Sequence, residues 1–294
     1  MKNFSIAQRI QRLMIAQFRF FFAFVSIFSQ RALSFFSQWV DWTMTLRIAT
    51  LNLEQNHKCW EQRRELIAAQ LSELNPDIVA LNEIHSPSQT GRWLQQAASS
   101  QMAAPYTLVQ QSKVGADTAC EAEGLLTRYP IVETASLDYR SHNCVALAAR
   151  FAVGGRTLDV YGTHLIAARV DDAARRYQVG KLLDWVGSRA DADAMVVCGD
   201  FNAAPDQPSI QLMAQSFRPT QSQATAFSPL CEPNGKPTHP EWPRFDRCID
   251  YIWIKGAVAV KGSGLCFNRP APDNPDLWPS DHVGVWADLE IGGK

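Results

Sequence analysis

From residue 46 onward, short apolar runs alternate with segments of helical periodicity. Apolar runs of strand length predict β-strands at 46–53, 77–84, 106–111, 124–131, 144–153, 157–165, 194–202, 248–255 and 283–291. Helical spacing predicts helices at 60–75 and 171–189; the first has Leu66, Ile67, Leu71 and Leu74 on one face. This alternation of strands and helices is typical of an α/β domain.

Local signals define several boundaries in this pattern. Asn75-Pro76 ends the first predicted helix, and Gly154-Gly155 predicts a hairpin between two strands. Residues 203–247 contain eight prolines and lack a clear period, so we expect a loop-rich segment that shapes a substrate mouth. Because no linker or repeat interrupts residues 44–294, we expect a single domain there.

Residues 1–43 form a basic, aromatic extension. Met14, Phe18, Phe21, Val25 and Phe28 lie on one face of a predicted amphipathic helix, and no acid occurs before Asp41. The apolar run 20–28 is too short to span a bilayer. Three interpretations remain open: a targeting leader, a helix in contact with a membrane surface, or a mis-assigned start that precedes Met44.

Charge and cysteine content narrow the functional classes. The extension carries five basic groups and one acid, whereas the remaining 251 residues carry 23 basic and 28 acidic groups, a net charge of −5. An acidic domain argues against a groove for duplex DNA, which needs many cationic contacts. The seven cysteines include no Cys-x-x-Cys pair, so we expect neither a disulfide framework nor a zinc site, and we expect the domain to fold in a reducing compartment. We also expect a monomer.

Polar side chains interrupt the apolar strands at particular ends. Four strands lead into Asn52 and Glu54, Asn82 and Glu83, His164, and Asp200 and Asn202; two later strands instead follow Asp250 and the pair Asp281-His282. If the last two strands run antiparallel to the first four, all these groups meet at one end of the sheets. Each of these polar residues alone has an ordinary structural explanation, although a buried Asp250 needs a partner. Their joint occurrence favours a functional site.

The chemistry of this set is that of metal-assisted phosphoester hydrolysis. Carboxylate oxygens without thiolates suit Mg²⁺ or Mn²⁺. Two histidines and additional acids suit proton transfer near neutral pH, and asparagine amides donate to phosphate oxygens without adding charge.

An ordered set of motifs resembles the endonuclease/exonuclease/phosphatase superfamily over about residues 46–291. The motifs are Leu51-Asn52, Asn82-Glu83, Gly162-Thr163-His164-Leu165, Gly199-Asp200-Phe201-Asn202, Ile249-Asp250-Tyr251 and Ser280-Asp281-His282. That group includes type I deoxyribonuclease, exonuclease III-like repair enzymes, neutral sphingomyelinases, inositol polyphosphate 5-phosphatases and deadenylases. The resemblance implies a four-layer α/β sandwich, with two mixed β-sheets packed face to face and helices outside.

The same resemblance implies a role for each matching residue. Glu83 is expected to be the principal ligand of Mg²⁺ (or Mn²⁺), with Asn52 beside it, Glu54 as an auxiliary acid and Asp281 as a possible second ligand. Asp200 is expected to orient or activate the attacking water, and Asn202 to hold the phosphate. Asp250 is expected to pair with His282, a general base or phosphate-stabilising group, and His164 to contact the phosphate or assist the leaving group. Which group takes the proton of the water stays open.

Two segments bear on the branch of the superfamily. Thr163-His164-Leu165 departs from the tyrosine-containing motif of abasic-site repair enzymes, which argues against that role. Residues 124–131 are similar to a segment of many bacterial and sphingomyelinase-like members; within them Arg128 either contacts substrate or pairs structurally.

We therefore expect a metal-dependent phosphodiesterase or phosphatase. A nuclease acting on DNA or RNA is the alternative within this class, and a catalytically silent binding module is the alternative outside it. Phe227, His239, Trp242, Arg244 and Phe245 would suit a base, a lipid or a small organic group, so the substrate class stays open. The acidic domain favours a small or single-stranded phosphoester over intact duplex DNA.

Deletion of residues 1–43 should leave both folding and hydrolysis intact, because the first predicted strand of the domain begins only at Leu46. Circular dichroism and turnover of the truncated chain, measured beside the full chain, check this. A soluble, folded but inactive truncation would make the extension part of the site.

Overall fold

The computed structural model describes residues 44–54, 59–100, 104–167, 170–189, 191–220 and 247–292. The predicted extension at 1–43 and the aromatic and basic residues at 227–245 lie outside these ranges. The helices described are α2 (Trp60–Leu74), α3 (Thr90–Ser100), α4 (Asp172–Gly187), α5 (Pro208–Ala214) and the short 3₁₀ helix η1 (Gly115–Asp117). None of them is both long enough and apolar enough to cross a membrane.

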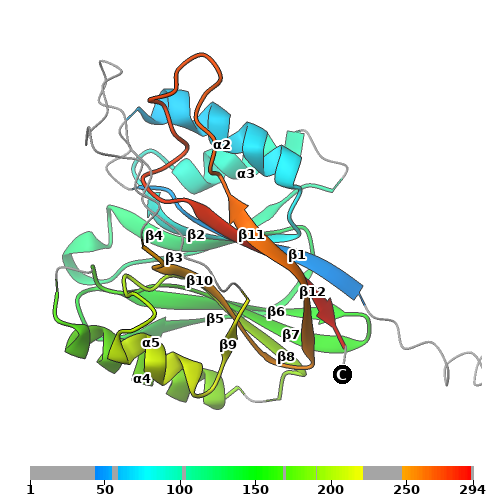
Figure 1. The fold of residues 1–294 in the computed structure, drawn as a ribbon, viewed down its shortest axis with the longest axis vertical. Helices are drawn as coiled ribbons and strands as arrows, with labels where there is room; N and C mark the ends of the chain where they lie inside the picture. The colour runs from blue at the N-terminus through cyan, green and yellow to red at the C-terminus, as the bar shows by residue number, and fades with distance from the viewer. Residues whose placement is uncertain are drawn as a thin grey trace, which may run out of the picture. The chain divides into compact units, whose positions relative to one another are not determined.

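The strands form two mixed sheets (Figure 1). The first has the order β11-β12-β1-β2-β4-β3, and the second β5-β6-β7-β8-β10-β9. Their bounds are β1 Met44–Asn52, β2 Ile78–His85, β3 Thr107–Ser112, β4 Glu121–Thr127, β5 Ile131–Asp138, β6 Val145–Val153, β7 Arg156–His164, β8 Ala194–Asp200, β9 Arg218–Pro219, β10 Asp250–Gly256, β11 Val258–Cys266 and β12 Gly284–Ile291.

Strand directions agree with the expectation drawn from the polar strand ends. The parallel pairs are β1 with β2 and β7 with β8, whereas β12 runs antiparallel to β1 and β10 runs antiparallel to β8. The ends of the four early strands therefore lie beside the beginnings of the two late ones.

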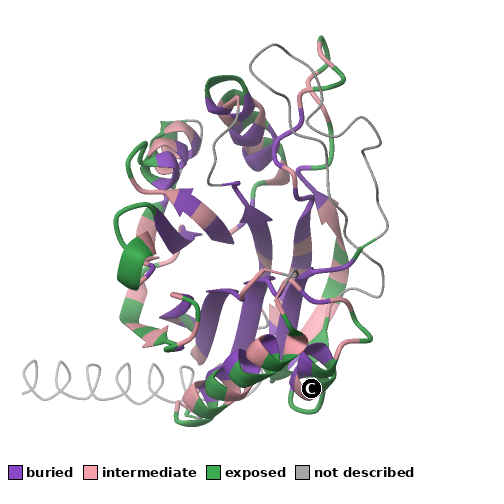
Figure 2. Cartoon of the chain, turned by 90° about the vertical axis from the view of Figure 1, so that its left-hand side faces the viewer, coloured by how far each residue is buried: buried purple, intermediate pink, exposed green. Residues whose placement is uncertain are grey.

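Three apolar clusters define four layers, which confirms the predicted sandwich. One cluster lies between the sheets and draws on the inner faces of both. A second joins the outer face of the β5–β10 sheet to α4 and α5, and a third joins the other sheet to α2 and α3. Figures 1 and 2 show the helices on the two outer sides and the buried strands between them.

Burial on both faces explains why the strands read as continuous apolar runs. In β1, Leu46 and Ile48 face the other sheet, while Ala49 and Leu51 face the helices. Because strand side chains alternate, the position of the last residue determines the face on which it lies. Asn52 has the parity of Leu46 and Ile48, and it therefore lies on the inner face.

The structure corrects several predicted elements. The apolar run at 124–131 is divided between β4 and β5, with the break before Pro130. Pattern reading also missed α3, α5, β5, β9 and β11. The reasons are local: α3 is rich in glutamine and serine, β5 is largely exposed, and β11 contains Gly262 and Gly264.

Gly199→Ala should lower the free energy of unfolding by about 3 kcal/mol or more. Gly199 has φ +135°, and an added Cβ would lie 2.0 Å from the Thr163 carbonyl oxygen on the paired strand β7. Gly180→Ala in α4 is the matched control, because nothing lies within 4 Å of its added Cβ; it should be neutral or stabilising by up to about 1 kcal/mol. Urea unfolding of both variants checks this, and equal stabilities would contradict the steric argument.

Candidate active site

The site lies where the inner faces of the two sheets change from apolar to polar. Asn52, the last residue of β1, is the register partner of Asn82 in β2. On the other sheet, Asp200 is the register partner of both His164 and Asp250. Strand pairing thus brings together residues that lie far apart in the sequence.

A local irregularity places Glu83 on the inner side. Regular alternation would point Glu83 toward the helices, because Asn82 faces inward. The register of β2 against β4 shifts between Leu81 and Ile84, and Glu83 has a left-handed φ of +55°. Ile84 consequently packs on the outer face, and the Glu83 carboxylate accepts a hydrogen bond of 3.0 Å from Asn52 Nδ2.

Asp200 lies at the centre of the polar group. Its Oδ2 accepts from Asn52 Nδ2 at 3.2 Å and lies 3.6 Å from His164 Nε2 and 3.8 Å from His282 Nε2. Burial, together with the negative charge of Asp250, raises the pKa of Asp200 to about 6.

The predicted pair of Asp250 and His282 is present. The distance between Asp250 Oδ2 and His282 Nδ1 is 2.8 Å, and both residues are buried. Burial lowers the pKa of His282, but Asp250, Asp200 and Asp281 raise it by more, so the pKa lies well above its ordinary value. The acid thus fixes the imidazole and favours its charged form.

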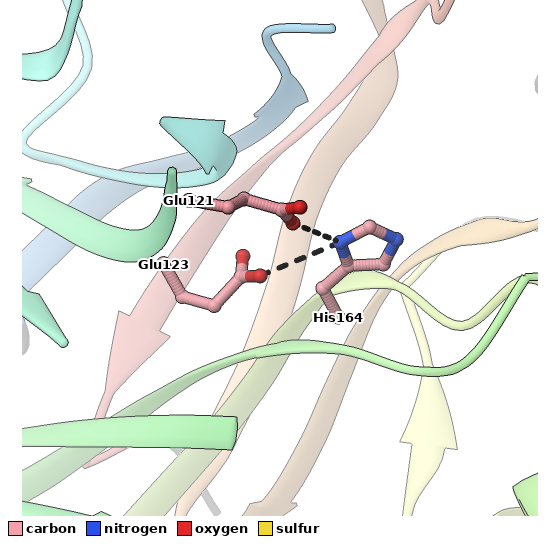
Figure 3. A group of neighbouring side chains, drawn as sticks. All are labelled: Glu121, Glu123 and His164. Carbon is pink, nitrogen blue, oxygen red and sulfur yellow. Dashed lines mark ion pairs between the residues drawn. The ribbon is translucent and has the colours of Figure 1, made fainter. Parts of the chain in front are cut away.

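His164 is held by groups that sequence analysis missed. Its Nδ1 lies 3.5 Å from Glu121 Oε1 and 3.4 Å from Glu123 Oε1, as Figure 3 shows. The two glutamates alternate on β4 with Ala122 and have the parity of Leu125, which faces the inter-sheet core. The available sequence signal was the pair Glu121 and Glu123, two positions apart and followed by the apolar Leu125 on the same face of the strand.

Asn202 is positioned by the turn that follows β8. Its φ is +51°, and its backbone N–H donates to Asp200 Oδ1 at 2.7 Å. Its Nδ2 donates to the Leu165 carbonyl at 3.0 Å and lies 3.1 Å from His164 Nε2. The amide therefore adjoins the histidine, where a bound phosphate would be within reach of both.

The two remaining predicted metal ligands have different surroundings. Burial raises the pKa of Asp281, and the nearby Glu83 carboxylate adds to this effect. Glu54 is instead engaged by Arg63, whose Nη2 lies 3.3 Å from Glu54 Oε2 and whose side chain is fully buried. Arg63 also donates to the Pro279 carbonyl at 2.8 Å, so this ion pair links β1 to the segment before Asp281.

Substrate contact and structural pairing are the two interpretations of Arg128. Arg128 donates to Asn75 Oδ1 at 2.7 Å and to Asp77 Oδ1 at 2.9 Å, beside the beginning of β2. Glu83 follows about five residues later along that strand, roughly 17 Å away. Structural pairing is the interpretation that the geometry supports.

A cavity of about 260 Å³ opens onto this group. It is lined by, among others, Glu83, Lys113, His164, Asp200, Asn202 and His282. Glu83 is more accessible than Asp200, with 20% of its side chain exposed against 1%. Hard oxygen donors at the edge of a polar cavity suit a divalent cation of the Mg²⁺ or Mn²⁺ type.

The chain belongs to the endonuclease/exonuclease/phosphatase family, whose model matches residues 49–282. This class comprises metal-dependent hydrolases that cleave phosphoesters, and the fold, the acids and the histidines described above are those of such an enzyme. The predicted family is thereby confirmed.

Sequence identity to individual relatives is low. Nocturnin of Xenopus laevis is 26% identical over an alignment of 256 residues, and the match covers 79% of this chain but only 65% of that protein. The human nocturnin catalytic domain with a bound sulfate anion has a TM-score of 0.62 and 23% identity, covering 84% of this chain and 94% of that one. TDP2 of D. rerio, complexed with a single strand DNA product, has a TM-score of 0.67 and 16% identity, covering 83% and 98%. At these identities the two structures show a shared fold.

Asp250→Asn and His282→Asn should each lower kcat by a factor of about 10³, because each removes part of one hydrogen-bonded unit. The double variant should be little slower than either single variant. Steady-state kinetics of the wild type and the three variants measure this coupling. Losses that multiply would show that the two residues act independently.

Proposed function

We propose that this protein is a Mg²⁺-dependent phosphodiesterase that acts on small or single-stranded phosphoesters. The observation that carries the proposal is the position of Asp200 Oδ2 between the Nε2 atoms of His164 and His282, at distances of 3.6 and 3.8 Å. This arrangement adjoins the Glu83 carboxylate and opens onto the cavity. It supplies, within one group, a carboxylate for water and two imidazoles for phosphoryl oxygens.

Glu83 and Asp281 are the residues that would hold the cation. Burial raises the pKa of Asp281 and the Glu83 carboxylate adds to this effect, so a divalent cation would relieve the repulsion between the two carboxylates. The ion would supply Lewis-acid stabilisation of the phosphoryl oxygens. Asn52 orients Glu83 through the amide hydrogen bond, and its role as a ligand stays a prediction.

The other residues act on the water and the phosphoryl group. Asp200 is buried between the histidines, where its oxygen can orient the attacking water and accept its proton. His282, charged through its pair with Asp250, stabilises negative charge on the phosphoryl oxygens. His164 and the amide of Asn202 lie 3.1 Å apart, and both face the space in which the leaving oxygen would sit.

Charge and cavity size support a small or single-stranded substrate. The net charge of −5 for residues 44–294 disfavours a duplex groove, and a cavity of about 260 Å³ accommodates a phosphoryl group with part of one neighbouring residue. The single strand DNA product in TDP2 supports nuclease action on a single strand as the second candidate.

The setting of the enzyme is part of the same proposal. We propose a monomer in a reducing compartment, and the free thiols of Cys120, Cys144, Cys198 and Cys266 support the compartment. The aromatic and basic composition of residues 1–43 supports contact with a membrane surface as their role.

Chelation should abolish turnover, and Mg²⁺ or Mn²⁺ should restore it. Glu83→Gln keeps the size of the side chain but removes the charge, so affinity for the cation should fall by at least tenfold and kcat by about 10²-fold or more. Glu73→Gln, a glutamate of α2 outside the site, is the matched control and should leave both unchanged. Titration of activity with Mg²⁺ and Mn²⁺ measures the effect, and full turnover in excess chelator would refute the role of the metal.

A substrate panel in Mg²⁺ or Mn²⁺ discriminates the candidate activities. It comprises single-stranded and duplex DNA, RNA, sphingomyelin, inositol phosphates and an aryl phosphodiester. We expect turnover of the small or single-stranded members. Efficient nicking of supercoiled plasmid with a steep salt dependence would overturn the preference against duplex DNA, and no turnover of any member would favour the silent binding module.

A further inference from the structure

Beside the proposed metal position, a second group of metal-ligating side chains lies between the sheets. Glu121 and Glu123 from β4 and His164 from β7 direct three donor atoms toward one another (Figure 3). These atoms are Glu121 Oε1, Glu123 Oε1 and His164 Nδ1; all are buried, and the nitrogen forms ion pairs with both oxygens. The His164 side chain is 92% buried, given its 8% exposure.

The spacing of these donors is that of ligands around a small divalent ion. His164 Nδ1 lies 3.5 and 3.4 Å from the two carboxylate oxygens. Ligands about 2.1 Å from a tetrahedral ion are about 3.4 Å apart. Two carboxylates and an imidazole are donors that suit Mn²⁺ or Zn²⁺.

A lysine ammonium, however, already occupies the charge-neutralising position. Lys113 Nζ is in contact with Glu121 Oε1 and lies 3.8 Å from Glu123 Oε1. The Lys113 backbone N–H donates to the Glu121 carbonyl at 2.9 Å, which fixes the stem of the side chain beside β4. With 9% of its side chain exposed, Lys113 is nearly as enclosed as His164.

Charge balance explains why the ammonium can replace an ion here. Two buried carboxylates without a cation would repel each other at high cost. Burial lowers the pKa of Lys113, but Glu123 and Glu121 raise it by more, so the amine stays charged. The ammonium thereby supplies one positive charge to the two carboxylates, and His164 Nδ1, which forms ion pairs with both, faces them from β7.

We propose that Lys113 is a built-in cation that takes the place of a second metal ion between Glu121, Glu123 and His164. The inference rests on the proposed function only in treating His164 as part of the active site. It predicts that the exogenous metal required for hydrolysis binds on the Glu83 side, and that His164 acts on the substrate as an unligated imidazole. Lys113 is in this view a positioning residue, because it acts through the two glutamates.

Removal of the ammonium should create a metal site. Lys113→Met keeps an unbranched stem but no charge, so the full-length variant should bind one more equivalent of Mn²⁺ than the wild type. Lys113→Arg keeps the charge and should bind the same number as the wild type. Equilibrium dialysis with electron paramagnetic resonance of free Mn²⁺ counts the bound ions without a substrate.

Three further variants locate the additional ion. Glu121→Gln and Glu123→Gln in the Lys113→Met background should each remove the extra equivalent, whereas Glu83→Gln in that background should leave it. The Tm of Lys113→Met should rise with Mn²⁺ by several degrees more than that of the wild type, because the ion relieves the repulsion between the glutamates.

An unchanged Mn²⁺ count in folded Lys113→Met would overturn the proposal. So would loss of one equivalent on placing Glu121→Gln or Glu123→Gln in the wild-type chain, since a metal would then already displace Lys113. This second arm stands even where Lys113→Met fails to fold. Failure of the proposed function would show instead as an inactive wild type with these counts unaltered.

Discussion

The site depends on one buried amide that joins the two sheets. Asn82, fully buried within β2, donates from Nδ2 to Glu123 Oε2 at 2.6 Å and to the Thr163 carbonyl at 2.9 Å. Its Oδ1 accepts from the backbone N–H of Asp200 at 2.9 Å. A single side chain thus links β2 and β4 of one sheet to β7 and β8 of the other. Because a buried amide is costly unless its partners are kept, these contacts set the spacing of the sheets at the site.

The remaining charges are arranged around that link as balanced groups. Glu121 and Glu123 face Lys113 and His164, and Asp200 and Asp250 face His282. A buried carboxylate is tolerated when a cation or hydrogen-bond donor accompanies it. Glu83 differs, because its carboxylate is partly exposed to the cavity. This difference in enclosure distinguishes acids that hold the site together from the acid that is available to an external cation.

Backbone conformation contributes as much as strand pairing. Glu54, Glu83 and Asn202 all have left-handed φ values, of +63°, +55° and +51°. Such conformations are unfavourable for residues other than glycine and cluster at functional sites, where surrounding contacts maintain them. Glu83 follows the inward-facing Asn82, whereas Glu54 and Asn202 lie just beyond the ends of β1 and β8. For Glu83, the left-handed backbone conformation returns the carboxylate to the inner side of the sheet.

The sequence by itself determined the layers, most strands and the set of acids, amides and histidines at their ends. It did so because alternation and burial on both faces are local properties that a run such as Val196–Asp200 carries in its own residues. Only the tertiary structure decided which residues the charged side chains contact. Arg128 pairs at the far end of β2, Glu54 is engaged by Arg63, and Lys113 lies between glutamates of a neighbouring strand. Those contacts depend on strand register and on the bulge before Ile84, which arise from packing across the sheets and not from any one segment.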